Sequence, residues 1–333
     1  TLYHWDLPQA LQDRGGWVNR DTAGWFGDYA AAVFRRLGDR VKIWFTLNEP
    51  QVAAFCGYAL GIHAPGVKKL GAAVQASHVL MLAHARGVQA YREVSPARHR
   101  IGIVLDLHPV YPFGDSSSDV EAAAMADQQI NRWYLDPVLT ARYPVELLAA
   151  YRKNGVAPQV EEGDLELLAA HPVDFLGVNY YFPDRARASA RAPLGYEIVE
   201  EKTVPKTEMG WEVYPRGLGD ILLRIKRDYN DPVMMVTENG AAYPDTESAN
   251  GKIEDDDRIE YIAGHLREAR RAIEEGVKLE GYFLWSLMDN FEWGFGYSKK
   301  FGIIGVDPKT HDRKWKRSAD WYASVVASRG AAL

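Results

Sequence analysis

Apolar residues gather into short, nearly continuous runs along the chain, separated by longer stretches of mixed character. Runs of this kind are typical of strands that are buried on both faces of a parallel sheet. The segment Thr1–Trp5 has the same character, and we expect it to be the end of one more strand. The apolar runs are Val41–Thr46, Ile101–Leu107, Val173–Val178, Val233–Thr237 and Gly281–Ser286.

The stretches between these runs predict helices. Arg258–Glu275 has apolar residues at helical spacing, acidic residues before its start and Gly276 after its end. Ala72–Tyr91 and Val120–Trp133 are alanine-rich and also read as helices. The alternation predicts an α/β fold, a (β/α)8 TIM barrel with about six of the eight β/α units in this chain. A doubly wound open sheet is the alternative, but no Gly-rich phosphate-binding motif follows a strand.

Polar and aromatic side chains follow the ends of the predicted strands. In a (β/α) barrel the carboxyl ends of the strands meet at one mouth, so these side chains would face a common cavity. A barrel selected for stability alone has no need of such a set. The strand-end segments are His4–Asp6, Asn48–Pro50, Asn179–Tyr181, Glu238–Gly240 and Trp285–Trp293.

Glutamates occur in the segments that follow two of the strands, at Glu49 and Glu238. Cleavage of a glycosidic bond needs paired carboxyl groups, because one protonates the leaving oxygen while the other attacks or stabilises the anomeric carbon. Pro50 follows Glu49 and favours an extended backbone there. A lone glutamate at a strand end is as often solvated or ion-paired, but two among amides and indoles predict a catalytic pair.

A sugar-binding site needs flat indoles against the C–H faces of the ring and polar groups against its hydroxyls. The candidates for these contacts are Trp5, Trp211, Trp285 and Trp293 for the faces, and His4, Asn48, Asn179 and Glu292 for the hydroxyls. We expect core packing for Trp17, Trp25 and Trp133. The histidines show no metal-ligand spacing, and we expect a structural or solvated role for His63, His78, His84 and His99. We expect Glu254–Arg258 to be a solvated helix start.

Composition and charge exclude several other classes of protein. A chain of 333 residues with 47% hydrophobic and 25% charged residues is neither disordered nor fibrous. The net charge of −6 argues against a nucleic-acid partner. No apolar run approaches the roughly 20 residues that span a bilayer, so we expect no membrane partner. Cys56 is the single cysteine, which excludes an internal disulfide and favours a cytoplasmic location.

The ordered motifs resemble the signatures of glycoside hydrolase family 1, the β-glucosidase family. The resemblance covers nearly the whole chain and implies a retaining exo-β-glycosidase that needs no cofactor and no metal. Its substrates would be small β-glucosides or oligosaccharides, O-glycosides with a terminal β-D-glucosyl residue or a related galactosyl or fucosyl residue. The matching segments are Thr46–Pro50, Gly57–Gly66, Asn179–Tyr181, Thr237–Gly240 and Trp285–Trp293.

The resemblance also implies a role for each site residue. Glu49 would be the general acid/base, Glu238 the nucleophile of a double displacement, and Tyr181 the group that orients the nucleophile. Glu292 would repel a phosphate, which favours unphosphorylated sugars. The substrate-binding residues would be His4, Trp5, Asn48, Asn179, Trp211 on the aglycone side, Trp285 under the bound sugar, Glu292 and Trp293.

The resemblance places two barrel strands of the family ahead of Thr1. We therefore expect residues 1–333 to form a single catalytic barrel domain that lacks its first two β/α units, with a second chain or segment that completes the barrel. An incomplete barrel would expose sheet edges, so the rival interpretation is a catalytically silent carbohydrate-binding barrel fragment.

Overall fold

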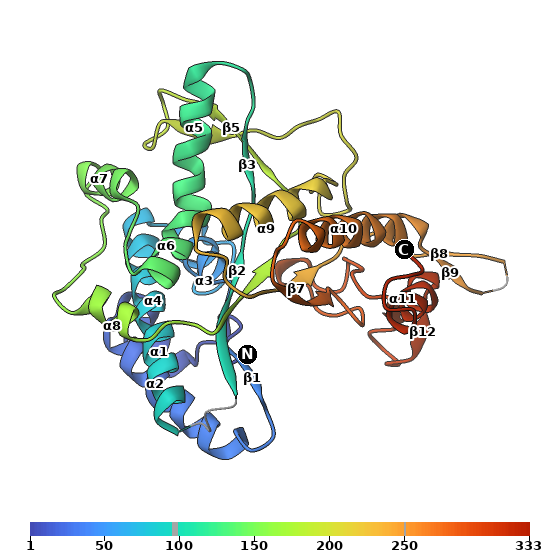
Figure 1. Cartoon of the computed structure of the whole chain (residues 1–333), viewed down its shortest axis with the longest axis horizontal. Helices are drawn as coiled ribbons and strands as arrows, with labels where there is room; N and C mark the ends of the chain where they lie inside the picture. The colour runs from blue at the N-terminus through green and yellow to red at the C-terminus, as the bar shows by residue number, and fades with distance from the viewer. Residues whose placement is uncertain (95–98, 250) are drawn as a thin grey trace. The chain divides into compact units, whose positions relative to one another are not determined.

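The computed structural model describes residues 1–94, 99–249 and 251–333 (Figure 1). These residues divide into two compact units. The first unit comprises Thr1–Val178 and Ala186–Ile198, and the second comprises Asn179–Arg185 and Val199–Leu333. The chain therefore passes between the units at three points, after Val178, Arg185 and Ile198.

The first unit alternates strands with helices. Its strands are β1 (Ile43–Asn48), β2 (Arg100–Asp106), β3 (Val110–Pro112), β4 (Phe175–Asn179, whose last residue belongs to the second unit), β5 (Asp184–Ala188, whose first two residues belong to the second unit) and β6 (Tyr196–Ile198). Its helices are α1 (Gln9–Gln12), α2 (Asp21–Leu37), α3 (Pro50–Ala54), α4 (Leu70–Val94), α5 (Ser117–Asp127), α6 (Trp133–Thr140), α7 (Val145–Lys153) and α8 (Asp164–Ala170). A 3-10 turn, η1 (Gly16–Val18), and two π-helical turns, η2 (Phe55–Leu60) and η3 (Gln128–Arg132), complete it.

The parallel strands of the first unit follow the order β1-β2-β4. β1 and β2 pair with Trp44 opposite Ile101. The interior of β2 and all of β4 are buried, as predicted for strands covered on both faces. The predicted strand Thr1–Trp5 is reduced to an isolated parallel bridge between Tyr3 and Leu47.

Helix α4 contains the predicted helix Ala72–Tyr91 and is buried along most of its length. Its small residues allow close approach, since a Cβ atom at Gly87 would lie only 3.0 Å from the Phe26 ring of α2 and 3.1 Å from Thr46 of β1. The predicted helix Val120–Trp133 is observed as α5 and the start of α6, joined by the π-helical turn η3.

The second unit contains the remaining elements. Its strands are β7 (Met234–Asn239), β8 (Thr246–Glu247), β9 (Ile253–Glu254), β10 (Leu279–Leu284), β11 (Ile304–Val306) and β12 (Arg313–Trp315). Its helices are α9 (Arg216–Asp228), α10 (Asp256–Glu274), α11 (Arg317–Ala327) and the 3-10 turn η4 (Trp293–Phe295).

β7 and β10 are parallel, with Met235 opposite Gly281. The prediction that the run Gly281–Ser286 is buried on both faces is wrong, because no residue of β10 is fully buried and Phe283 is 56% exposed. Among the described strands β10 pairs with β7 alone, so one of its edges has no ladder partner. In α10, Ile262 is buried as predicted, whereas Ile273 in the last turn is 49% exposed.

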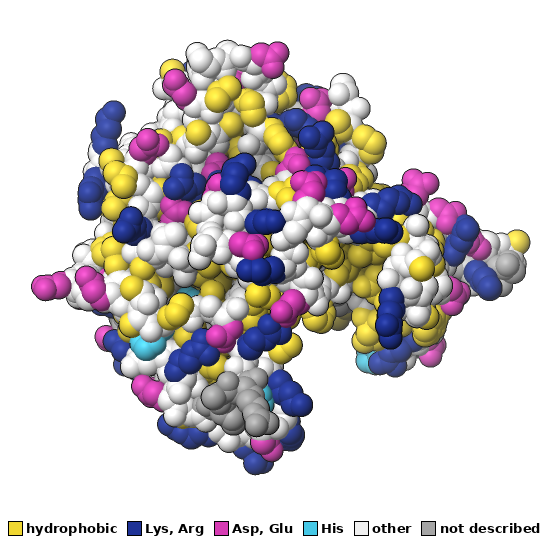
Figure 2. All heavy atoms as spheres, in the orientation of Figure 1, with side chains coloured by type: hydrophobic (Ala, Val, Ile, Leu, Met, Phe, Trp, Pro, Cys, Tyr) yellow, Lys and Arg dark blue, Asp and Glu magenta, His cyan; other side chains and the backbone are white. Residues whose placement is uncertain are grey.

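Basic and acidic side chains are interspersed on the face shown in Figure 2, with apolar side chains between them. This mixture agrees with a modest net charge and provides no continuous basic surface on that face. Within the described ranges, no helix combines the length and the apolar character needed to cross a bilayer.

Candidate active site

Glu238 lies at the carboxyl end of β7, where its side chain is half-buried. The Tyr181 hydroxyl donates a hydrogen bond of 2.7 Å to Glu238 Oε2. The backbone of the two segments is also joined, because the Tyr180 amide donates to the Glu238 carbonyl over 3.0 Å. The structure therefore brings together the two residues for which the family resemblance implies the roles of nucleophile and orienting group.

A buried set of hydrogen bonds supports the Tyr181–Glu238 pair. Asn239, directly after the nucleophile candidate, donates to the Tyr180 carbonyl over 2.7 Å and accepts from the Tyr282 hydroxyl over 2.6 Å. Tyr261 of α10 donates to the Tyr181 carbonyl over 2.8 Å. These bonds hold the Tyr180–Tyr181 backbone beside Asn239 and Tyr261, both of which are buried.

Asn179 ends β4 and is fully buried. Its Oδ1 accepts a hydrogen bond of 2.7 Å from the Thr237 hydroxyl, which precedes Glu238. Asn179 therefore contacts the nucleophile strand directly, in addition to the sugar-binding role that the sequence suggests.

Trp211 and Trp285 pack against one aromatic cluster of the second unit. The Trp211 ring stacks on Phe182 at a centroid distance of 5.1 Å and lies 5.1 Å from the Tyr181 ring. A Cβ atom at Gly240 would lie 1.6 Å from the Trp285 carbonyl oxygen, so the chain after Glu238 touches the chain after β10. The two indoles thus lie beside the residues that surround the nucleophile candidate.

Glu292 and Trp293 follow β10 in the same unit. The Glu292 amide donates to the Gly296 carbonyl over 2.7 Å, and Trp293 is 38% exposed. Burial raises the pKa of the Glu292 carboxyl above its ordinary value. A carboxylate with a nearby exposed indole is suited to hydroxyls and C–H faces of a sugar.

The expectation that Glu254–Arg258 is a solvated helix start is right for Asp256 and Asp257, which are exposed in the first turn of α10, but wrong for Asp255 and Arg258, which are buried. Arg258 is fully buried and forms an ion pair with Asp255, which also accepts from the Ser318 amide over 2.8 Å. The Arg258 guanidinium donates to the carbonyls of Ala241 and Lys300. It therefore anchors the chain just beyond Glu238, a role that local charge patterning does not reveal because the two carbonyl partners are distant in sequence.

In the first unit, His4, Trp5 and Asn48 are in contact. Asn48 Nδ2 lies 3.2 Å from His4 Nε2, and Trp5 Nε1 donates to the Asn48 carbonyl over 3.1 Å. Burial lowers the pKa of His4, which favours a neutral imidazole that can accept the amide hydrogen. Three of the residues predicted to bind the sugar are therefore gathered next to Glu49.

Glu49 is buried, with 5% of its surface exposed, and its amide donates to the Val104 carbonyl of β2 over 2.9 Å. The extended backbone expected from Pro50 is wrong. Glu49 has φ 47° and ψ 64°, in the left-handed region, and Pro50 is the first residue of α3. The chain must turn sharply from β1 into α3, and Pro50 favours the helix start through its fixed φ. A non-glycine residue in this region is strained, and such strain is common at functional sites.

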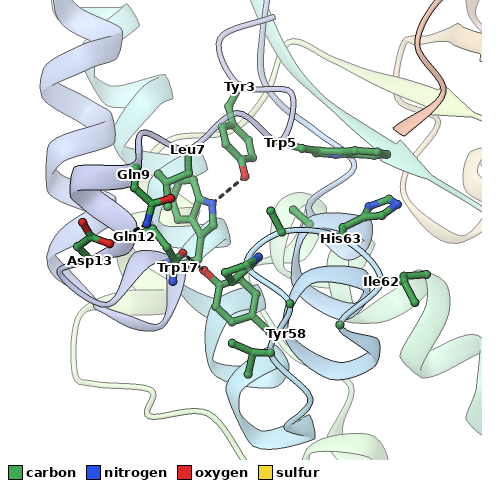
Figure 3. A pocket seen from close by; sticks show the side chains of 16 residues that line it. Tyr3, Trp5, Leu7, Gln9, Gln12, Asp13, Trp17, Tyr58, Ile62 and His63 are labelled. Atoms are coloured by element: carbon green, nitrogen blue, oxygen red, sulfur yellow. Dashed lines mark hydrogen bonds between the residues drawn. The ribbon is translucent and has the colours of Figure 1, made fainter. Parts of the chain in front are cut away.

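A pocket of about 580 Å³ opens beside Trp5 (Figure 3). The Trp5 and His63 rings lie 5.2 Å apart on one side of it, and Gln9, Gln12 and Asp13 lie on the other. His63, which the sequence assigned to a structural or solvated role, therefore lines a cavity next to a candidate sugar-binding residue. The lining residues are Tyr3, Trp5, Leu7, Gln9, Gln12, Asp13, Trp17, Ala53, Tyr58, Gly61, Ile62, His63, Ala64, Pro65, Gly66 and Val67.

The other aromatic and histidine residues behave mostly as predicted. Trp17 and Trp133 are buried and donate to Tyr3 and Ser77. His78 and His84 are buried in hydrogen-bonded positions, whereas Trp25 is half-buried beneath the Arg14 guanidinium. Among residues 1–94, 99–249 and 251–333, no group of three or more His, Cys, Asp or Glu side chains could hold a metal ion.

Parallel strands with polar and aromatic residues at their carboxyl ends are the arrangement found in barrel enzymes that act on small molecules. The profile of the family described as Glycosyl hydrolase family 1 matches residues 1–331. The chain belongs to glycosyl hydrolase family 1, and its fold is of the α/β TIM-barrel type.

Proteins and structures similar to this chain agree with that assignment. "Beta-glucosidase A" of Acetivibrio thermocellus is 46% identical over 99% of this chain and 74% of its own length. "Beta-glucosidase A" of Thermotoga maritima is 42% identical over 99% of this chain and 73% of its own. A solved structure of the Thermotoga maritima enzyme in complex with deoxynojirimycin has a TM-score of 0.94, 42% identity, and covers 98% of this chain and 73% of that one.

Proposed function

We propose that this protein is an exo-β-glucosidase, which hydrolyses terminal β-D-glucosyl residues of O-glycosides. The observation that carries the proposal is the hydrogen bond from the Tyr181 hydroxyl to Glu238 Oε2, in a chain that belongs to glycosyl hydrolase family 1. A nucleophilic carboxylate must present one oxygen in a fixed direction, and a donated hydroxyl provides that constraint. Galactosides and fucosides are further candidate substrates of the same site.

The proposed reaction is a retaining double displacement. Glu238 attacks the anomeric carbon while Glu49 protonates the leaving oxygen, and a covalent glycosyl-enzyme forms. Glu49 then removes a proton from water, which attacks the same carbon and releases the sugar with its β configuration. This mechanism requires the two carboxyl groups to lie about 5–5.5 Å apart.

The substrate-binding side chains have distinct proposed roles. Asn48 and Asn179 would bind hydroxyls near the reacting carbon, and Trp285 would lie under the sugar ring. His4, Trp5, Glu292 and Trp293 would bind the outer hydroxyls, with Trp211 on the aglycone side. The half-buried carboxylate of Glu292 disfavours a phosphorylated sugar, since two anions would share one site.

The proposal also covers the organisation of the chain. Residues 1–333 would act as one catalytic barrel domain with about six β/α units, supported by the parallel strands β1, β2, β4, β7 and β10 and by the Tyr3 bridge. A cytoplasmic location, without a nucleic-acid partner, is supported by the single cysteine and the net charge of −6.

Incubation with an aryl β-glucoside tests the activity. Turnover with β-glucose as the first product supports the retaining enzyme. Deoxynojirimycin binding without any turnover supports the silent carbohydrate-binding alternative and rejects the enzyme.

The roles of the two glutamates are tested by azide rescue. Glu238→Gly should abolish turnover, and azide should restore cleavage and yield the α-glycosyl azide, because the small anion attacks from the vacated face. Glu49→Ala is the matched variant, and its azide product should be the β-glycosyl azide. A β product from Glu238→Gly would remove Glu238 from the nucleophile role.

A further inference from the structure

Lys316 is a fully buried cation outside the residues assigned to the site. Its side chain has no exposed surface, and it precedes α11 in the second unit. Its backbone amide donates to the Ile303 carbonyl over 3.1 Å. A buried ammonium group requires compensating anions, so its partners indicate what it does.

The first partner is Asp289, whose side chain is 4% exposed. Lys316 Nζ donates to Asp289 Oδ1 over 3.2 Å, and the Gly302 amide donates to the same oxygen over 2.8 Å. The Asp289 amide in turn donates to the Ile304 carbonyl over 3.0 Å. Asp289 therefore fixes the start of the segment Asp289–Trp293, which carries Glu292 and Trp293.

The second partner is Asp245, whose carboxylate lies 2.7 Å from Lys316 Nζ. Asp245 belongs to the segment that continues from Glu238 at the end of β7. One ammonium group thus pairs with a carboxylate on the segment after the nucleophile candidate and with another on the sugar-binding segment. Lys300 adds a weaker contact, with its Nζ 3.8 Å from Asp289 Oδ2.

We propose that Lys316 is a positioning residue, which fixes the segment carrying Glu292 and Trp293 relative to the segment that follows Glu238. The inference rests on the proposed function, because it assigns Glu292 and Trp293 to the outer hydroxyls of the sugar. Removal of the ammonium leaves two carboxylates without their shared cation, and the two segments then separate through repulsion and hydration. Recognition of the outer hydroxyls is the property that this movement changes.

The test compares Lys316→Met with wild type on three aryl β-glucosides, the parent sugar and the analogues that lack the 4- or the 6-hydroxyl. For the parent, kcat/KM should fall at least about tenfold, mainly through KM, because displaced binding groups lose their geometry. For at least one deoxy analogue the fall should be much smaller, since the affected contact is already absent. A purely structural role would lower all three values by one common factor.

Lys314→Met is the matched control. Lys314 lies two residues away and pairs with Glu247, but its side chain is 42% exposed and it has no contact with Asp289 among the described residues. All three kcat/KM values should stay within about twofold of wild type, as expected for an exposed ion pair. An equal fall for all three substrates with Lys316→Met, or no fall for the parent, overturns the proposal.

Two further measurements test the role of Lys316 if the wild-type chain shows no turnover or if Lys316→Met does not fold. Deoxynojirimycin binding, measured by calorimetry, needs no turnover, so it tests Lys316→Met even if the wild-type chain hydrolyses no glucoside. The affinity for deoxynojirimycin should fall about tenfold, and an unchanged affinity overturns the proposal.

If Lys316→Met does not fold, Asp289→Asn removes only the charge on the sugar-binding side. Asp289→Asn should lower the ratio of kcat/KM for the parent glucoside to kcat/KM for at least one deoxy analogue. An unchanged ratio overturns the proposal.

Discussion

At the scale of single residues, the Tyr181 hydroxyl is the contact that defines the nucleophile candidate. It reaches Glu238 Oε2 over 2.7 Å from a side chain that is 8% exposed. A hydrogen bond to a charged group in a buried position contributes about 1.5–3 kcal/mol. Such a bond holds the carboxylate in one orientation.

Tyr181→Phe should therefore lower kcat/KM for an aryl β-glucoside by roughly 10- to 100-fold, through lost orientation of Glu238. Steady-state kinetics measure the effect. The control is Tyr180→Phe, which deletes an equally buried hydroxyl that donates to the Tyr214 carbonyl over 2.6 Å. Tyr180→Phe should lower thermal stability with little effect on kcat/KM. Equal kinetic losses in both variants would contradict the role of Tyr181.

The resemblance to glycoside hydrolase family 1 implies this contact. The apolar runs before Tyr181 and Glu238 predict only that both residues face one mouth of the barrel, because the carboxyl ends of parallel strands gather at one edge. The sequence did not predict the burial of Arg258 or Lys316. Apart from Asp255, the partners reported for them are Ala241, Lys300, Asp245 and Asp289, which become neighbours only after the chain folds. Arginine and lysine side chains are rarely fully buried, so the local sequence around Arg258 and Lys316 favours a solvent-exposed position for both.

At the scale of elements, the ends of β7 and β10 approach so closely that only glycine fits between them. Gly240 follows β7, and an added Cβ atom there would lie 1.6 Å from the Trp285 carbonyl oxygen. The obstacle is backbone, so a side-chain rotation does not relieve it. The position of Trp285 beside the end of β7 thus depends on the absence of a side chain at Gly240.

Gly240→Ala should force β7 and the Trp285 backbone apart. We expect a loss of about 1–3 kcal/mol in the free energy of unfolding and at least about a hundredfold fall in kcat/KM. Chemical denaturation and kinetics measure the two effects. Gly281→Ala in β10 is the control, because its Cβ atom would lie no closer than 3.4 Å to another residue. Unchanged kinetics in Gly240→Ala would contradict the importance of this approach.

Strands β2 and β4 and the long helix α4 follow from the apolar pattern, since their burial is nearly continuous along the sequence. The three-stranded sheet β3-β5-β6 was not predicted, because its strands are short and largely exposed, as in β6. The turn η3 was also missed, since a π-helical turn keeps helical composition while it shifts the register. Boundaries shift by a few residues where polar site residues extend a strand, as at Asn48 and Asn239.

At the scale of the whole molecule, buried histidines tie stability to pH. Burial lowers the pKa of His84 to about 3 and that of His265 to about 4, from an ordinary value of 6.5. Both side chains lie in the interior, where His84 hydrogen-bonds to Thr46 over 2.7 Å. The folded protein holds them neutral while the unfolded chain protonates them.

Stability should therefore be fully present above pH 6.5 and should fall as pH decreases below it, because the unfolded chain binds protons that the folded chain excludes until about pH 3–4. Each histidine contributes a slope of about 1.4 kcal/mol per pH unit in this window. Urea denaturation between pH 7.5 and about 5 measures the slope. His84→Gln should reduce the slope of the unfolding free energy against pH by about 1.4 kcal/mol per pH unit, because one of the two histidines is removed. His311→Asn, at an exposed position, should leave the slope unchanged. An unchanged slope in His84→Gln would contradict this account.

The left-handed backbone of Glu49 has a consequence for directed evolution of this chain. The conformation costs a side-chain-bearing residue about 1–2 kcal/mol that glycine does not incur. Replacement of Glu49 by glycine would thus relieve strain and delete the proposed acid/base carboxyl in the same step. A library screened for thermal stability alone would enrich inactive variants with glycine at position 49. Selection for thermal stability must therefore be combined with selection for turnover.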